Sequence, residues 1–83
     1  MNKESAVKAI RAIARLNNVI ENVESVFGKP RDDSQLYWLS SDLVENFLYA
    51  IGGEECDKNY DILFGISMED DFEEVYERLM VLD

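Results

Sequence analysis

Every second residue from 57 to 61 has a carboxylate or amide side chain: Asp57, Asn59 and Asp61. The first half of a calcium-binding loop has the same spacing. Such a loop also needs a glycine at its sixth position for a sharp turn and a glutamate at its twelfth as a bidentate ligand. The chain has Ile62 and Met68 at those two positions, so the ligand set is incomplete. We interpret the segment as an acidic helix start beside a solvated loop, and we expect no metal and no cofactor.

The only cysteine, Cys56, is the side chain best suited to nucleophilic catalysis. A reactive thiolate needs a base or a positive charge nearby, but the chain has no histidine, and carboxylates at residues 54, 55 and 57 surround this thiol. Gly52-Gly53 is not a phosphate loop either, because the acidic residues that follow it repel a phosphate. A chain this short also has little material for a deep pocket. The sequence therefore predicts a non-enzymatic protein without catalytic residues.

Aromatic and acidic side chains at helical spacing favour protein binding instead. If residues 34–51 form one helix, the side away from its apolar residues carries Trp38, Asp42, Glu45 and Tyr49. Exposed Trp and Tyr side chains supply large contact areas, and carboxylates steer and orient a basic partner. The alternative is that Trp38 packs into the core, as Trp side chains in small domains commonly do.

The last predicted helix collects its acids on one side. These residues are Asp70, Glu73, Glu74 and Glu77. Like charges three or four residues apart destabilise a helix by a few tenths of a kcal/mol per pair, so this pattern costs about 1 to 2 kcal/mol. A basic partner would compensate for that cost, and we predict that these four residues bind it. The alternative is an acidic face that is merely solvated.

Length and composition limit the classes of protein that fit. The chain has 83 residues, a net charge of −10 and 47% hydrophobic residues, which predicts one folded domain over residues 1–83 and argues against disorder. The acidic charge disfavours nucleic acid or an anionic membrane as direct partner. One cysteine cannot form an internal disulfide, and no targeting or membrane-spanning segment is visible, so we expect a cytoplasmic protein.

Hydrophobic periodicity predicts an all-α fold, a small helical bundle of three long helices and one short helix. The predicted elements are a basic helix at 4–27, a turn at 28–33, an acidic helix at 34–51, a short helix within 54–66 and an acidic helix at 68–82. Gly28 and Pro30 end the first helix, Gly52-Gly53 ends the second, and a Ser67–Asp70 capping pair begins the last. An alternative start at Ser41 would shorten the second helix.

Each long helix has one apolar face that we expect in the core. In helix 4–27 the apolar positions are Ala6, Ala9, Ile13, Leu16, Ile20, Val23 and Phe27. In helix 34–51 they are Leu36, Leu39, Leu43, Phe47 and Ile51, flanked by Val44 and Leu48. In helix 68–82 they are Phe72, Val75, Tyr76, Leu79 and Leu82.

The first helix leaves two arrangements open. Its spacing of three and four residues is also that of a coiled coil, so helix 4–27 could form a homodimer instead of packing only within its own chain. Its basic residues Lys8, Arg11 and Arg15 are expected to face an acidic helix of the same fold. Asn17 and Asn18 are expected to weaken the middle of the helix, because their side chains compete for the backbone.

Residues 63–70, with the sequence LFGISMED, resemble the stretch that follows the second helix of acyl carrier proteins, which are also small, acidic and four-helical. Those proteins carry a prosthetic group on the Ser of an Asp-Ser-Leu motif at the start of that helix. The corresponding candidate here is Ser41, which is followed rather than preceded by an Asp. The resemblance implies a carrier protein modified on that serine.

The sequence thus predicts a small acidic binding protein that docks on a basic protein, including one that itself binds nucleic acid. The expected outcome of docking is inhibition or escort, by analogy with immunity proteins, antitoxins and phage-encoded inhibitors. The alternative function is a self-associating helical structural or adaptor protein. An acyl-carrier-like protein is the minor alternative.

Overall fold

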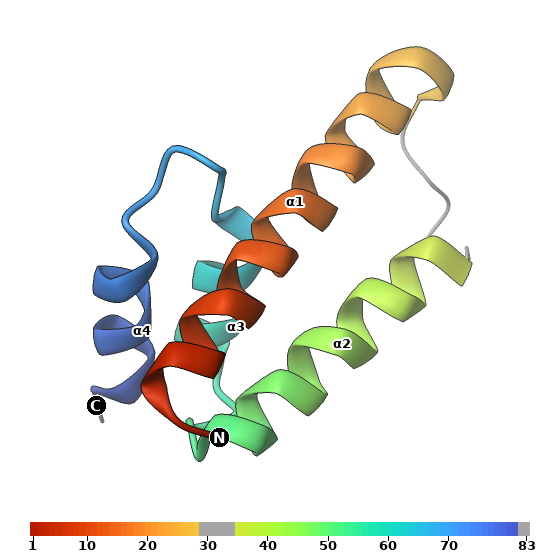
Figure 1. The fold of residues 1–83 in the computed structure, drawn as a ribbon. Coiled ribbons are helices and arrows are strands. Elements are labelled where there is room, and N and C mark those ends of the chain that lie inside the picture. Colours follow the sequence, from red (N-terminus) through yellow and green to blue (C-terminus); the bar gives the residue numbers. More distant parts are fainter. Residues whose placement is uncertain (29–34, 82–83) are drawn as a thin grey trace.

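The computed structural model describes the backbone of residues 1–28 and 35–81 and the side chains of residues 1–28 and 40–81. Four helices make up the described chain: α1 (Lys3–Phe27), α2 (Gln35–Ile51), α3 (Asp57–Gly65) and α4 (Phe72–Met80). The predicted all-α bundle is confirmed, and no strand occurs in the described ranges. Helix α1 contacts the other three helices, and α3 lies between α2 and α4, which do not contact each other in the described part (Figure 1).

Helix α1 begins and ends close to the predicted bounds because both of its ends are capped. The Ser5 N–H donates to Asn2 Oδ1 at 2.8 Å, which satisfies one of the free donors of the first turn. Gly28 follows the last turn with a φ of 86°, a left-handed conformation that glycine adopts without strain. The Gly28 N–H donates to the Glu24 carbonyl at 2.9 Å and closes the helix.

The buried face of α1 differs from the predicted stripe. Ala6 and Ile13 are buried as expected, but Ile10 and Ala14 are buried as well. Further along the helix, Leu16, Ile20 and Val23 are half-buried, but Phe27 is exposed, so the prediction that Phe27 belongs to the core is wrong. The second half of α1 extends beyond α3 and α4 (Figure 1). All three of the other helices therefore pack together only around the first half of α1.

Helix α2 confirms the longer of the two predicted starts, since its interior already includes Ser41. Its core residues are Val44, Phe47, Leu48 and Ile51. The predicted flanks Val44 and Leu48 are thus at the centre of the packed face, and Leu43, predicted to be core, is 41% exposed. The side chains of Leu36 and Leu39 lie outside the described residues.

The C-terminus of α2 is closed by the two glycines, as predicted. Gly52 has a φ of 74°, and the Gly53 N–H donates to the Leu48 carbonyl at 3.0 Å. The Gly52 N–H donates to the Tyr49 carbonyl at 3.2 Å. This pair of bonds satisfies carbonyls of the last turn that have no partner within the helix.

Helix α3 is the predicted short helix, and it joins α4 through polar side chains. Asn59 is fully buried, and its Nδ2 donates to the Glu54 carbonyl at 2.8 Å and the Leu79 carbonyl at 3.1 Å. Lys58 Nζ donates to the Val81 carbonyl at 2.6 Å. The residues that could have begun a calcium loop therefore form a helix that caps the end of α4.

Helix α4 is shorter than the predicted 68–82. The Ser67–Asp70 pair does interact, because the Ser67 N–H donates to Asp70 Oδ2 at 2.8 Å, but it closes a turn before the helix. Asp71 is the actual cap, accepting from the N–H groups of Glu73 and Glu74. Val75 and Leu79 are buried and Phe72 and Tyr76 half-buried, as predicted, while Leu82 lies outside the described residues.

Candidate binding surfaces

The predicted residues of α2 share the outer side of that helix. Asp42 and Glu45 are exposed, and Tyr49, one turn after Glu45, is 83% exposed. An aromatic ring this accessible in a small protein is available for contact with another molecule. Trp38 lies one turn before Asp42 in the same helix, but its side chain is outside the described residues.

Aromatic residues of α3 extend this surface. The rings of Tyr60 and Phe64 stack with centroids 6.3 Å apart and planes 18° apart, and Phe64 is 44% exposed. Burial raises the pKa of the Tyr60 phenol, and Glu55 and Glu45 raise it further. Glu45 of α2 therefore lies within electrostatic reach of Tyr60 of α3.

We call this surface the α2–α3 face. It consists of Asp42, Glu45, Tyr49, Glu55, Tyr60 and Phe64. For Tyr60 and Phe64 the sequence predicted only a short helix and no role in partner binding. The spacing of four between Tyr60 and Phe64 was the signal for a shared side, but the sequence could not indicate that α2 packs next to it.

The acidic residues predicted for the last helix form a second surface, on α4 and in the turn just before it. Asp70, Glu73, Glu74 and Glu77 are all exposed. Glu77 accepts a hydrogen bond from Lys3 Nζ at 2.8 Å, and this bond raises the pKa of Lys3. Because α2 and α4 do not touch within the described chain, the predicted partner-binding residues whose side chains are described lie on two separate surfaces.

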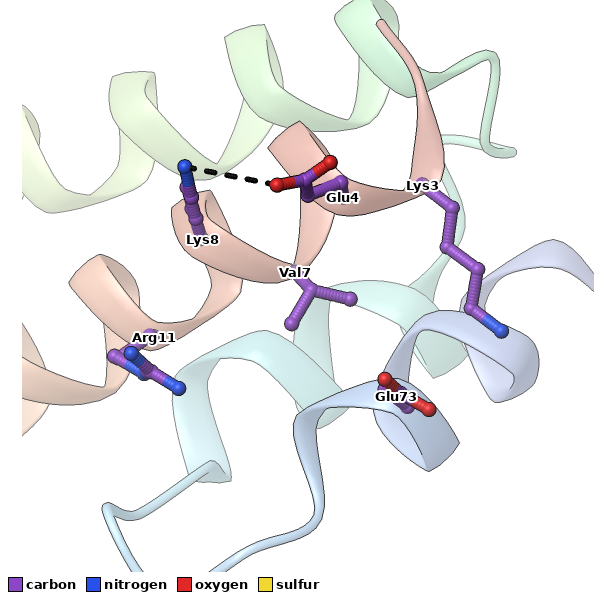
Figure 2. A pocket seen from close by; sticks show the side chains of 6 residues that line it. All are labelled: Lys3, Glu4, Val7, Lys8, Arg11 and Glu73. Atoms are coloured by element: carbon purple, nitrogen blue, oxygen red, sulfur yellow. Dashed lines mark ion pairs between the residues drawn. The ribbon is translucent and has the colours of Figure 1, made fainter.

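An open groove of about 500 Å³ lies along the first half of α1 where it meets α4. It is lined by Lys3, Glu4, Val7, Lys8, Arg11 and Glu73. Figure 2 shows Val7 in the middle, with Lys8 and Arg11 on one side and Lys3 on the other.

The basic residues around this groove mainly hold α4 in place. Lys3 Nζ lies 5.9 Å from the centre of the Tyr76 ring, and the Arg11 guanidinium lies 5.7 Å from that of Phe72. Lys8 was expected to face an acidic helix, but its ammonium lies 3.9 Å from Glu4 in its own helix instead. The groove combines charges of both signs around one apolar side chain, which suits helix packing better than binding of a single ion.

Neither the candidate nucleophile Cys56 nor the candidate carrier serine Ser41 lies in the surroundings that its chemistry requires. Cys56 is half-buried at the N-terminus of α3, where its side chain makes no capping bond. Ser41 is half-buried in the interior of α2, whereas the acyl-carrier resemblance implies a serine at a helix start. No group of three or more potential metal-binding side chains occurs among the described residues.

Comparisons with protein-family models, with curated proteins and with solved structures find no match to this chain. None of the helices in the described ranges combines the length and the apolar character that crossing a membrane requires.

Proposed function

We propose that this chain is a small acidic binding protein that docks on a basic protein and inhibits or escorts it. The proposed partner-binding residues are Trp38, Asp42, Glu45, Tyr49, Asp70, Glu73, Glu74 and Glu77. Catalysis, a bound metal and a cofactor have no place in this proposal. Immunity proteins, antitoxins and phage-encoded inhibitors are the classes of protein that act in this way.

One observation supports the proposal above all: the carboxylates of α2 have no cationic partner in the described chain. The ion pairs there join Lys3 to Glu77 and Lys8 to Glu4, and all four residues belong to α1 or α4. Carboxylates that no internal cation compensates favour a partner that supplies the positive charge.

The test is affinity capture with the tagged chain at low and at high salt, followed by reconstitution with the purified captured protein. We expect a basic partner, a defined stoichiometry and an affinity that falls as salt rises. The partner's own activity is then measured with and without the chain. Failure to reconstitute a complex with any captured basic protein would reject the proposal.

Self-association through α1 is the second candidate function. It is favoured by apolar side chains on the protruding half of this helix, since Val19, Val26 and Phe27 are 52%, 73% and 83% exposed. Sedimentation of the wild-type chain and of Phe27→Gln tests it, because a dimer through this surface should dissociate in the variant. Native mass spectrometry also tests the carrier alternative, which requires a mass raised by a group on Ser41.

A further inference from the structure

We propose that the α2–α3 face, rather than the acidic face of α4, is the docking surface and that it recognises arginine side chains of the basic partner. This inference rests on the proposed function, and it names both the surface and the chemistry of the bound group. The occupant is an arginine-bearing segment of a basic protein.

The first argument is the difference in charge compensation between the two surfaces. On α4, Glu77 is paired with Lys3, Asp70 accepts from the Ser67 N–H, and Asp71 caps the helix. On the α2–α3 face no ion pair of the described chain reaches Asp42, Glu45 or Glu55. Glu73 and Glu74 of α4 likewise have no ion pair in the described chain. An incoming cation therefore avoids competition with a resident cation at every carboxylate of the α2–α3 face but at only part of the α4 surface.

The second argument is the position of the cations. The described basic residues of α1 are Lys3, Lys8, Arg11 and Arg15, and Arg78 belongs to α4. Lys58 belongs to α3, but its ammonium binds carbonyls of the α4 end, the Arg78 and Val81 carbonyls. Figure 1 shows α2 and α4 on opposite sides of α1. Lys3 and Arg11, which contact Glu77 and Phe72 of α4, therefore lie on the side of α1 away from the carboxylates of α2.

The third argument is the aromatic content, which selects arginine over lysine. Tyr49 is 83% exposed and lies one turn from Glu45, and Phe64 is 44% exposed and stacks on Tyr60, which lies within electrostatic reach of Glu45. A planar guanidinium can lie flat on such a ring while its edge donates to a carboxylate. A lysine ammonium is more strongly hydrated and has no flat face to stack, so it gains the charge attraction alone.

The experiment compares oligo-arginine and oligo-lysine peptides of equal length at about 0.15 M salt, where long-range attraction is largely screened. Two charge reversals change the net charge equally: Asp42→Lys with Glu45→Lys on the α2–α3 face, and Glu69→Lys with Glu74→Lys on the α4 side. All four positions are exposed, and circular dichroism checks that both variants keep the fold. A third variant, Tyr49→Ala, removes the exposed ring.

We expect wild type to bind oligo-arginine at least about threefold more tightly than oligo-lysine, which one stacking contact would supply. The α2 reversal should weaken oligo-arginine binding about tenfold or more, and the α4-side reversal by less than about threefold. Tyr49→Ala should remove the preference for arginine while binding of oligo-lysine is retained.

Three results would overturn the inference while the proposed function survives. Equal losses in the two reversals would mean that net charge alone governs binding, and a larger loss in the α4-side reversal would place the surface on α4. Equal affinities for the two peptides would exclude arginine selection. If neither peptide binds wild type, even at low salt, the proposed function fails together with this inference.

Discussion

Two asparagine side chains connect the ends of helices in this protein. Asn17 of α1 donates from Nδ2 to the carbonyls of Leu63 and Ile66, at 2.9 and 3.0 Å, at the end of α3. Asn59 makes the equivalent connection to the end of α4. Carbonyls in a last helical turn have no partner within the helix, so these amides satisfy groups that packing would otherwise leave unpaired. Asn17 was expected to compete for the backbone of α1, but its amide donates to α3 instead.

Replacing Asn17 with Ala should lower the free energy of unfolding by about 1 to 3 kcal/mol, because two carbonyls at the end of α3 lose their donor. Chemical denaturation of the variant measures this loss. The matched control is Asn18→Ala, since Asn18 is the exposed neighbour in the same helix and Ala is the better helix former. Equal effects at the two positions would mean that the bonds to α3 do not stabilise the fold.

Tyr60 predicts how stability depends on alkaline pH. Burial first, and then Glu55 and Glu45, raise the pKa of this phenol above its ordinary value of 10.0. A raised pKa in the folded state means that the folded chain binds the proton more tightly, so stability is retained below pH 10 and lost as pH rises through the raised value. The tyrosinate absorbance of wild type minus that of Tyr60→Phe should show this late titration. Glu45→Gln should shift this titration to lower pH. An unchanged curve would mean that Glu45 does not influence the Tyr60 phenol.

At the scale of the elements, α4 depends on its surroundings. A helix of nine residues is too short to be stable alone in water. Here Val75 and Leu79 are buried in the core, Asp71 caps the start, and Lys58 and Asn59 bond to carbonyls at the end. The amides of α4 should therefore be protected from hydrogen exchange only while all of these contacts are intact.

Removing the α4 cap with Asp71→Ala should destabilise the protein by about 1 kcal/mol, within a range of about 0.5 to 2 for such caps. Faster hydrogen exchange should be concentrated in α4. Asp71→Asn is the control, because an asparagine oxygen can accept the same bonds and should preserve most of the stability. A loss as large in Asp71→Asn as in Asp71→Ala would show that charge, and not the cap, stabilises this helix end.

The difference between the predicted and the observed buried face of α1 leads to a prediction at two positions. Ile10, outside the predicted stripe, is fully buried, whereas Phe27, the last stripe residue, is 83% exposed. Ile10→Gln should destabilise the fold by several kcal/mol, because it removes a packed side chain and buries an amide without partners. Phe27→Gln should leave the melting temperature of the monomer nearly unchanged. Similar thermal melts for the two variants would contradict the buried face described here.

At the scale of the whole molecule, charge is separated along the chain. Residues 1–31 carry six basic and three acidic side chains, and residues 32–83 carry two basic and fifteen acidic ones. In the described part, contacts between Lys3 or Arg11 and α4 use only some of the basic charge. Repulsion among the remaining carboxylates should therefore dominate the electrostatics of the folded state.

The melting temperature should consequently rise when salt is increased from about 0.02 to 0.5 M, because a shorter Debye length screens this repulsion. Thermal melts across a salt series at neutral pH measure the effect. Lys3→Gln, which removes an attractive pair with Glu77, should make the rise steeper. A melting temperature that falls steadily with salt would mean that attractive pairs outweigh the repulsion.

The sequence alone determined the fold class, the bounds of α1 and α2 and the outer side of α2. These properties depend on local chemistry: Gly28 and Gly52 end helices through their backbone freedom, and periodicity separates the Tyr49 side from the Phe47 side. The start of α4 was missed because Ser67 and Asp71 both offer caps, and only packing of the segment selects between them.

Only the tertiary structure decided which apolar residues of α1 are buried and which acidic residues lie on the same surface. Helix α1 is apolar on more than one side, and the positions of α3 and α4 select Ile10 and Ala14 over Phe27. In the same way, the bundle separates the carboxylates of α2 from those of α4 and brings Glu45 within electrostatic reach of Tyr60. Periodicity specifies the side of a helix on which a residue lies, but the neighbour on that side depends on how the helices pack.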